Sequence, residues 1–163
     1  MKTDLFITLA LFFFLGCVNQ ELAQMNSQDQ ETAKTEIREV VKVIFQSLEN
    51  MDIEALFQPY LDSPDFILFT TDASMENYEK AKNEHAKWFK SLSTLKVTAV
   101  NDEFKFLPGN IVICAWLGKF KMSLKTGMHL KIDKFGITFI FSKIDNQWKV
   151  LYQHSSALPP VQE

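Results

Sequence analysis

The chain has 163 residues, which is the length of one ordinary domain and is short for two. Hydrophobic residues make up 47% of the chain and include 15 Phe, so a sizeable core can form. The 17 basic and 20 acidic residues give a net charge of −3, and the sequence lacks the basic stripe with which proteins bind nucleic acid. These features predict one globular domain with no nucleic-acid partner.

The N-terminus has the pattern of a targeting segment. Lys2 precedes an apolar run, Leu5 to Leu15, that is too short to span a bilayer and is typical of the h-region of a signal peptide. The run ends in Leu15-Gly16-Cys17, which resembles the lipobox of bacterial lipoproteins, where cleavage precedes a Cys that is then lipidated. We expect residues 1–16 to be a signal peptide and Cys17 to anchor the protein in the bacterial cell envelope. The alternatives are an ordinary secretory leader, which would release a soluble periplasmic or secreted protein, and an uncleaved anchor.

The stretch that follows is predicted to be a flexible tether. Residues 17–31 are rich in Gln and Asn and lack a sustained apolar period, so they bury too little surface to offset the entropy lost on ordering. The folded domain is expected at residues 32–158, followed by a tail at 159–163. Once Cys17 is acylated, Cys114 has no intramolecular partner, and its apolar neighbours indicate a buried core thiol.

Two helices are predicted at the start of the domain. Apolar residues recur at helical spacing from Ile37 to Leu48, which indicates an amphipathic helix. Asp52 can cap a second helix by accepting hydrogen bonds from free backbone N–H groups. Pro59 keeps that helix short, because proline removes a backbone hydrogen bond.

A third helix is predicted after a short β-type run at residues 66–71. Either Asp72 or Ser74 can cap it, and it is expected to extend to about Leu92. One of its sides carries Tyr78, Ala81, His85, Trp88 and Leu92. Opposite charges four residues apart occupy the outer side, which indicates a solvated face.

From Leu95 onward the apolar period changes to two, which predicts long antiparallel strands. Breaks in this alternation near residues 100–102 and at 134–136 indicate a β-bulge at the first place and a bulge or glycine bend at the second. In the last strand we expect one shared face for Trp148, Val150, Tyr152, His154 and Ser156. That face begins apolar and ends polar, as the wall of a half-open cavity does.

Helices followed by long bent strands predict an α+β fold, in which three N-terminal helices cover a curved antiparallel sheet. The order of elements and the ending Trp148-Lys149-Val150-Leu151-Tyr152-Gln153-His154-Ser155-Ser156 resemble the nuclear transport factor 2-like superfamily and, within it, the SnoaL-like branch. Many SnoaL-like domains share a last-strand pattern that is matched here by Trp148, Lys149, His154 and Ser156, whereas Tyr152 stands where a second His is common. The resemblance implies a cone-shaped fold with an interior cavity.

The same resemblance implies a choice of functions, because the superfamily includes isomerases, cyclases, dehydratases and proteins without a known reaction. Its steroid isomerases carry a Tyr in the first helix, and this chain has no Tyr within residues 36–48. That difference counts against steroid-isomerase chemistry. Fold analogy alone does not supply a function.

Five residues are expected to line a ligand pocket: Tyr152, His154, Ser156, Trp88 and Trp116. A neutral imidazole beside a phenol can orient a ligand carbonyl or exchange a proton, whereas the structural interpretation is a His hydrogen-bonded at the end of the sheet. The two Trp rings can stack on a flat apolar ligand, although filling the core is the simpler role for them.

Asp72 and His154 are the catalytic candidates. A buried carboxylate at Asp72 can act as a general base if burial raises its pKa, and a helix N-cap is the structural alternative. His85 and His129 are interpreted as surface residues. Because the three His lack metal-ligand spacing and no Gly-rich phosphate loop is present, neither a metal nor a cofactor is expected.

We therefore predict that the domain binds a small apolar or amphipathic molecule in its cone cavity. Two copies are expected to pair through the outer face of the sheet, and contact with the membrane is expected only through the lipid anchor. An acid/base enzyme of the isomerase, cyclase or dehydratase type, using Asp72 and His154, is the first alternative. A protein-interaction module with a filled cone and an exposed apolar sheet face is the second.

Overall fold

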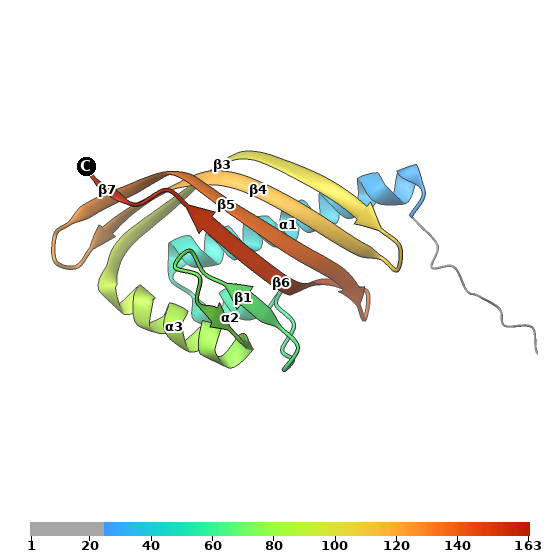
Figure 1. Cartoon of the computed structure of the whole chain (residues 1–163), viewed down its shortest axis with the longest axis horizontal. Helices are drawn as coiled ribbons and strands as arrows, with labels where there is room; N and C mark the ends of the chain where they lie inside the picture. The colour runs from blue at the N-terminus through green and yellow to red at the C-terminus, as the bar shows by residue number, and fades with distance from the viewer. Residues whose placement is uncertain (1–24) are drawn as a thin grey trace, which may run out of the picture.

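The computed structural model describes residues 25–163 (Figure 1). The predicted signal peptide and the lipidated Cys17 lie outside these residues. The described elements are α1 Ser27–Asn50, α2 Ile53–Phe57, β1 Ile67–Phe69, β2 Met75–Glu76, α3 Tyr78–Ser91, β3 Leu92–Leu107, β4 Ile111–Leu124, β5 His129–Ile144, β6 Gln147–Ala157 and β7 Val161–Gln162. Among residues 25–163, no helix has the length and hydrophobicity needed to cross a membrane.

The strands form one curved sheet in the order β2-β1-β6-β5-β4-β3, with β7 paired to β5. β1 runs parallel to β6, and the other neighbouring strands are antiparallel. Figure 1 shows α1 behind the long strands, and α3 beside the short β1–β2 hairpin. The predicted α+β fold, with N-terminal helices on a curved sheet, is confirmed.

Helix α1 covers the inner face of the sheet with one apolar side, as its periodicity predicted. Ile37, Val41, Ile44 and Leu48 are buried on that side. The helix begins at Ser27 rather than near residue 32, because Asn26 caps it by accepting a hydrogen bond from the Asp29 N–H at 2.9 Å. The extra turn is polar, so no apolar period marks it.

The caps of the two following helices differ in how well the sequence predicted them. Asp52 caps α2 by accepting from the Ala55 N–H at 3.1 Å, as predicted. The predicted cap of α3 is wrong, because α3 begins after Asn77, whose side chain accepts from the Lys80 N–H at 2.9 Å. Asp72 instead lies in the preceding turn, where its carboxylate accepts a hydrogen bond from the Ser74 N–H at 3.0 Å.

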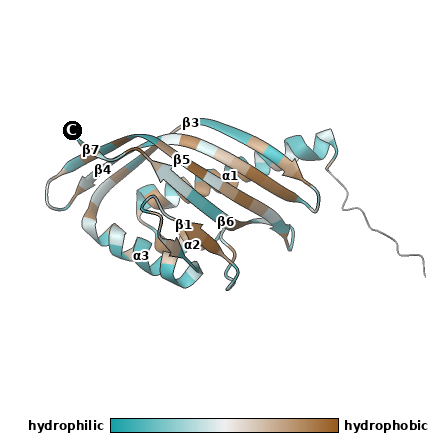
Figure 2. Cartoon of the chain, in the orientation of Figure 1, coloured by the Kyte–Doolittle hydropathy of each residue, from teal (hydrophilic) through white to brown (hydrophobic). Residues whose placement is uncertain are grey.

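The core lies between α1 and the inner face of the sheet, and Figure 2 shows hydrophobic residues running along β4 and β5. The rings of Phe45 and Trp116 have centroids 4.2 Å apart. A Cβ at Gly118 would lie 2.0 Å from the Trp116 ring, so this strand position has room for glycine only. Cys114 is buried in the same region, where desolvation raises the pKa of its thiol to about 12, which confirms a core thiol.

Polar contacts hold α1 to the sheet on both sides. The Arg38 guanidinium donates two hydrogen bonds to the Asp102 carboxylate, at 2.9 and 2.8 Å. On the other side Glu36 accepts from Lys143 at 2.8 Å and from the Trp148 indole at 2.7 Å, and these bonds lower the pKa of the Glu36 carboxyl. These polar bonds therefore fix the orientation of α1 on the sheet, in addition to its apolar packing.

The long strands contain four register shifts, one at Ser93 at the start of β3 and three β-bulges farther along that govern which side chains face inward. The first leaves Val100 of β3 unpaired, where the sequence predicted a bulge. The second sets Asp133 and Lys134 of β5 opposite a single β4 residue, one residue earlier than predicted. The third was not predicted: Phe141 pairs with Val150 and Ile140 pairs with Tyr152, which leaves the residue between them, Leu151, as the extra residue of β6.

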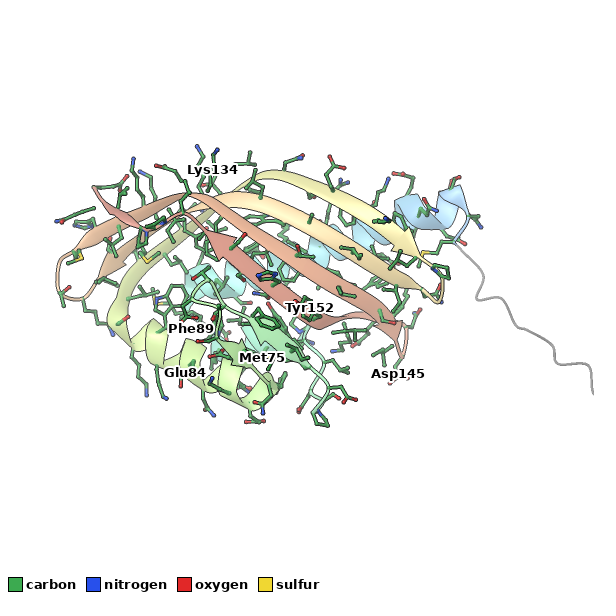
Figure 3. The ribbon with its side chains drawn as sticks, in the orientation of Figure 1. Met75, Glu84, Phe89, Lys134, Asp145 and Tyr152 are labelled. Atoms are coloured by element: carbon green, nitrogen blue, oxygen red, sulfur yellow. The ribbon has the colours of Figure 1, made fainter. Side chains whose placement is uncertain are left out.

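The bulge at Leu151 reverses the inward and outward sides of the second half of β6. Before it, Trp148 and Val150 are buried, and after it Gln153 and Ser155 are buried. The prediction of one continuous face is therefore wrong, because one inserted residue moves every following side chain to the other side of the strand. Figure 3 shows Tyr152 on the viewer's side of β6, whereas α1 lies behind the sheet.

Candidate functional site

A cavity of about 290 Å³ lies between α3, the end of β1, the last turn of α1 and the inner face of β4, β5 and β6. Most of its wall is apolar and consists of Leu48, Leu68, Trp88, Phe120, Met122, Ile132, Phe135 and Ile137. The polar part of the wall consists of Thr70, Thr71, His85, Gln153 and Ser155. Pockets for small ligands have volumes of roughly 300–1,000 Å³, so this one suits a small molecule.

A chain of hydrogen bonds runs along the sheet side of the cavity. The Tyr60 hydroxyl donates to Gln153 Oε1 at 2.7 Å, and Gln153 Nε2 donates to Ser155 Oγ at 3.0 Å. All three residues are buried, with exposed fractions of 5%, 7% and 6%. Burial raises the pKa of Tyr60, so its phenol keeps its proton and acts as a donor. The chain fixes the orientation of the two side chains that line the cavity.

His85 occupies the helix side of the cavity. Its Nδ1 lies 2.8 Å from the backbone carbonyl of Ala81, which can only accept, so Nδ1 carries the hydrogen and Nε2 carries the lone pair. Desolvation lowers the pKa of His85, although the hydrogen bond to the Ala81 carbonyl and the negative charge of Glu76 oppose this shift. The imidazole is therefore neutral at pH 7 and can accept a hydrogen bond or a proton.

A polar groove adjoins the cavity and shares Thr70, Thr71, His85 and Trp88 with it. The groove residues that are not shared are Asp72, Ser74, Glu76, Lys80 and Glu84. Glu76 is 7% exposed, and one of its oxygens lies 3.8 Å from Lys80 Nζ, whereas the other has no hydrogen-bond partner within residues 25–163. Figure 3 shows Glu84 on α3. In the described part of the chain, no three His, Cys, Asp or Glu side chains gather as a metal site.

Of the five predicted pocket residues, only Trp88 lines this cavity. Trp116 packs under α1 and lines a separate groove beside the Arg38–Asp102 pair. Tyr152, His154 and Ser156 lie on the outer side of β6, where Tyr152 is half-buried and the other two are exposed. The polar groups that do reach the cavity from β6 are their sequence neighbours.

The structure does not bring Asp72 and His154 into one cavity. Asp72 is exposed at the groove, and hydrogen bonds from Thr70 and Ser74 lower its pKa to about 2. This shift is opposite to the one that a general base needs, so the condition under which Asp72 could act as a base is not met. His154 faces outward beside Phe69, with ring centroids 5.7 Å apart.

Sequence reasoning missed His85, Gln153 and Ser155. His85 was interpreted as a surface residue, whereas its side chain is half-buried and lines the cavity; the helical period had placed it on the same side as Ala81, which is fully buried. No comparable signal marked Gln153 and Ser155. Their inward direction depends on the bulge at Leu151, which the alternating polar and aromatic residues around it do not reveal.

Comparisons with known proteins agree on the family and the fold. A family model described as SnoaL-like domain matches residues 37–161. A nuclear transport factor 2-like superfamily protein from Salmonella enterica subsp. enterica serovar Typhimurium is 18% identical, with a TM-score of 0.71 over 80% of this chain and 94% of that one. No curated protein sequence matches.

Two further solved structures have the same fold. A type 2 hexachlorocyclohexane dehydrochlorinase is 11% identical, with a TM-score of 0.74 over 85% of this chain and 93% of that one. A nuclear transport factor 2-like protein of unknown function from Pseudomonas putida KT2440 is 17% identical, with a TM-score of 0.66 over 78% and 88% of the two chains. Identities this low show the fold alone.

Proposed function

Because this chain belongs to the SnoaL-like family, we propose that it binds a small amphipathic molecule in the cavity between α3, β1 and the sheet. The observation that supports this most is an apolar cavity of about 290 Å³ whose wall carries the buried, oriented pair Gln153 and Ser155. Ligand pockets are largely apolar, with a few placed polar groups that orient the ligand. This wall has that composition.

The charges of the adjoining groove restrict the polar end of the molecule. Asp72, Glu76 and Glu84 line this groove together with Lys80, and Glu84 is also paired with Lys87 at 2.7 Å, so the carboxylates outnumber the ammonium groups and the groove is negative. His85 adds no charge, because burial keeps it neutral. A carboxylate would be repelled here, so the ligand is an uncharged or a cationic molecule.

The proposal includes a location at the bacterial cell envelope, through a lipid on Cys17. Its support is the pattern Leu15-Gly16-Cys17 after a short apolar run. Cys17 precedes the folded domain by a stretch of Gln- and Asn-rich residues, so an anchored domain would stand clear of the membrane.

Filling the cavity tests the binding proposal. Met122 is half-buried and lines the cavity, whereas its neighbour Lys121 is exposed. The probe is 2-acetyl-6-(dimethylamino)naphthalene, whose emission moves to shorter wavelength in an apolar site. We expect this blue shift with the wild-type protein and with Lys121→Trp, and its loss with Met122→Trp. An equal blue shift with all three proteins would overturn the cavity as the binding site.

A second candidate function is proton transfer, and His85 is the observation that favours it. Its neutral ring carries a lone pair on Nε2, and His85 lines both the cavity and the groove, close enough to the carboxylate of Glu76 to feel its charge. A base in this position would take a proton from a carbon next to a ligand carbonyl. In D₂O, wild-type protein should then speed hydrogen–deuterium exchange at the methyl group of 2-acetylnaphthalene, as followed by NMR. The same exchange rate with His85→Gln would exclude this role.

A further inference from the structure

The direction of the hydrogen-bond chain determines which atom Ser155 offers to the cavity. The Tyr60 phenol donates to Gln153 Oε1 at 2.7 Å, which sets the carbonyl end of the amide toward Tyr60. The amide nitrogen therefore points the other way, and it donates to Ser155 Oγ at 3.0 Å. The Tyr60 donor thus fixes the orientation of the Gln153 amide, and the amide in turn donates to Ser155 Oγ.

The end of this chain is a hydroxyl group with an unused hydrogen. Ser155 Oγ accepts from Gln153, and within residues 25–163 no group accepts a hydrogen bond from it. Ser155 is 94% buried, since 6% of it is exposed, and it lines the cavity beside Ile137. A buried donor without an acceptor lowers stability, so an acceptor inside the cavity would be bound favourably.

We propose that the ligand carries a carbonyl oxygen, as in a ketone or an ester, which accepts a hydrogen bond from Ser155 Oγ. This inference rests on the proposed binding function and specifies the chemistry of the ligand. A ligand hydroxyl would also accept from Ser155, but its own hydrogen would then need a second acceptor, such as the His85 imidazole on the helix side of the cavity, whereas a carbonyl oxygen needs no second partner. A carboxylate oxygen is disfavoured by the negative groove.

Two ligands that differ only in the carbonyl oxygen test whether the cavity prefers a carbonyl group. The probes are 2-acetylnaphthalene and 2-isopropenylnaphthalene, in which a CH₂ group replaces the carbonyl oxygen. We expect the ketone to bind the wild-type protein about tenfold more tightly by titration calorimetry, since one net hydrogen bond is worth roughly that factor.

Two variants at neighbouring positions identify the donor. Ser155→Ala removes the inward hydroxyl, and Ser156→Ala makes the same change at an exposed residue on the outer side of β6. The preference for the ketone should vanish in Ser155→Ala and persist in Ser156→Ala. Vanishing in Ser156→Ala instead would overturn the assignment and support the continuous face predicted from sequence.

An infrared measurement needs no variant and so does not depend on how the variants fold. With a ¹³C-labelled carbonyl, the C=O stretch of the bound ketone should lie at lower wavenumber than in an alkane solvent, because the hydrogen bond weakens the double bond. Binding of both compounds with equal affinity and an unshifted stretch would refute the carbonyl inference and leave cavity binding intact. Binding of neither compound would contradict the proposed function itself.

Discussion

At the residue scale, the polar composition of the cavity wall depends on Leu151. This single extra residue in β6 places Gln153 and Ser155 inside and leaves His154 outside. A sequence read with strict alternation therefore selects the neighbours of the residues that line the cavity. Strand β6 therefore contributes an amide and a hydroxyl to the cavity wall instead of the predicted imidazole and phenol.

Tyr60→Phe tests whether the hydrogen-bond chain is formed. The change removes the donor to Gln153 Oε1 and leaves a buried acceptor unpaired, which costs about 1–3 kcal/mol. We expect that loss in the free energy of unfolding measured with urea. Tyr152→Phe, on the outer side of β6, is the matched control and should change stability by about 0.5 kcal/mol or less. Equal losses in the two variants would mean that the Tyr60 hydroxyl contributes no special bond.

The lowered pKa of His85 predicts a dependence of stability on pH. Below about pH 6.5 the unfolded chain binds a proton at His85 that the folded protein does not bind. The stability contributed by the neutral ring is therefore complete above that pH and falls as the pH decreases through it. The free energy of unfolding of wild type, relative to His85→Gln, should decrease between about pH 7.5 and pH 5.

The matched control for this pH dependence is Asn83→Ala, since Asn83 is exposed on α3 and its side chain does not ionise. Because this change removes no titratable group, its difference from wild type should stay nearly constant over the same range. A constant difference for His85→Gln as well would contradict the burial of a neutral imidazole at the cavity.

At the scale of single elements, the missing side chain of Gly118 leaves room for the Trp116 ring of the same strand, β4. An added Cβ would lie 2.0 Å from the Trp116 ring and 2.7 Å from the Thr98 carbonyl oxygen. Gly118→Ala should therefore lower the free energy of unfolding by about 1–3 kcal/mol, as overpacking does. Gly136→Ala is the control, because the nearest atom to its Cβ would be the Ser156 hydroxyl oxygen, at 3.3 Å. Similar melting temperatures for the two variants would show that the Trp116 ring is free to move aside.

The elements also show how far the sequence could predict the structure. The apolar period predicted α1 and its buried side, and changes in alternation predicted the bulge at Val100 and nearly located the one at Lys134. The start of α1 and the cap of α3 depend on single hydrogen bonds from Asn26 and Asn77, which a hydrophobic pattern does not register.

The candidate site was less predictable than the fold for a physical reason. Trp88 was identified because a helical period gives the direction of a side chain without knowledge of the neighbouring strands. The direction of Gln153 and Ser155 is set by pairing between β5 and β6, a long-range contact that shifts by one residue at the bulge. Residues on both sides of β6 are polar or aromatic there, so no burial pattern distinguishes them.

At the scale of the whole molecule, we propose that two copies of the chain pair through the outer face of the sheet. Ile113, Ile140 and Tyr152 pair across β4, β5 and β6 on this face and are half-buried, and Leu117 is 40% exposed. Ile140→Lys would place a charge in the centre of a two-fold contact and should convert a dimer into a monomer in light scattering.

A matched control for the dimer prediction is Glu79→Lys, an exposed charge change on α3. The particle mass of this variant in light scattering should equal that of the wild-type protein. A wild-type protein that is already monomeric at micromolar concentration would contradict the proposed dimer.

The proposed anchor is tested on the full chain in a bacterial host. Cys17 should become labelled when cells are fed an alkyne analogue of palmitate, and Cys17→Ser should not be labelled. The buried Cys114 remains in both chains, so it controls for acylation at another thiol. Equal labelling of the two proteins, or labelling of neither, would contradict a lipid on Cys17.

The most direct test of cavity binding is native mass spectrometry of the wild-type protein and of Met122→Trp, both purified from a bacterial host. We predict that the wild-type protein retains one small, neutral or cationic compound with a carbonyl group, which denaturation releases. The variant should lack this compound, because the indole fills the cavity that Met122 lines. The same compound retained in equal amount by both proteins would contradict binding in this cavity.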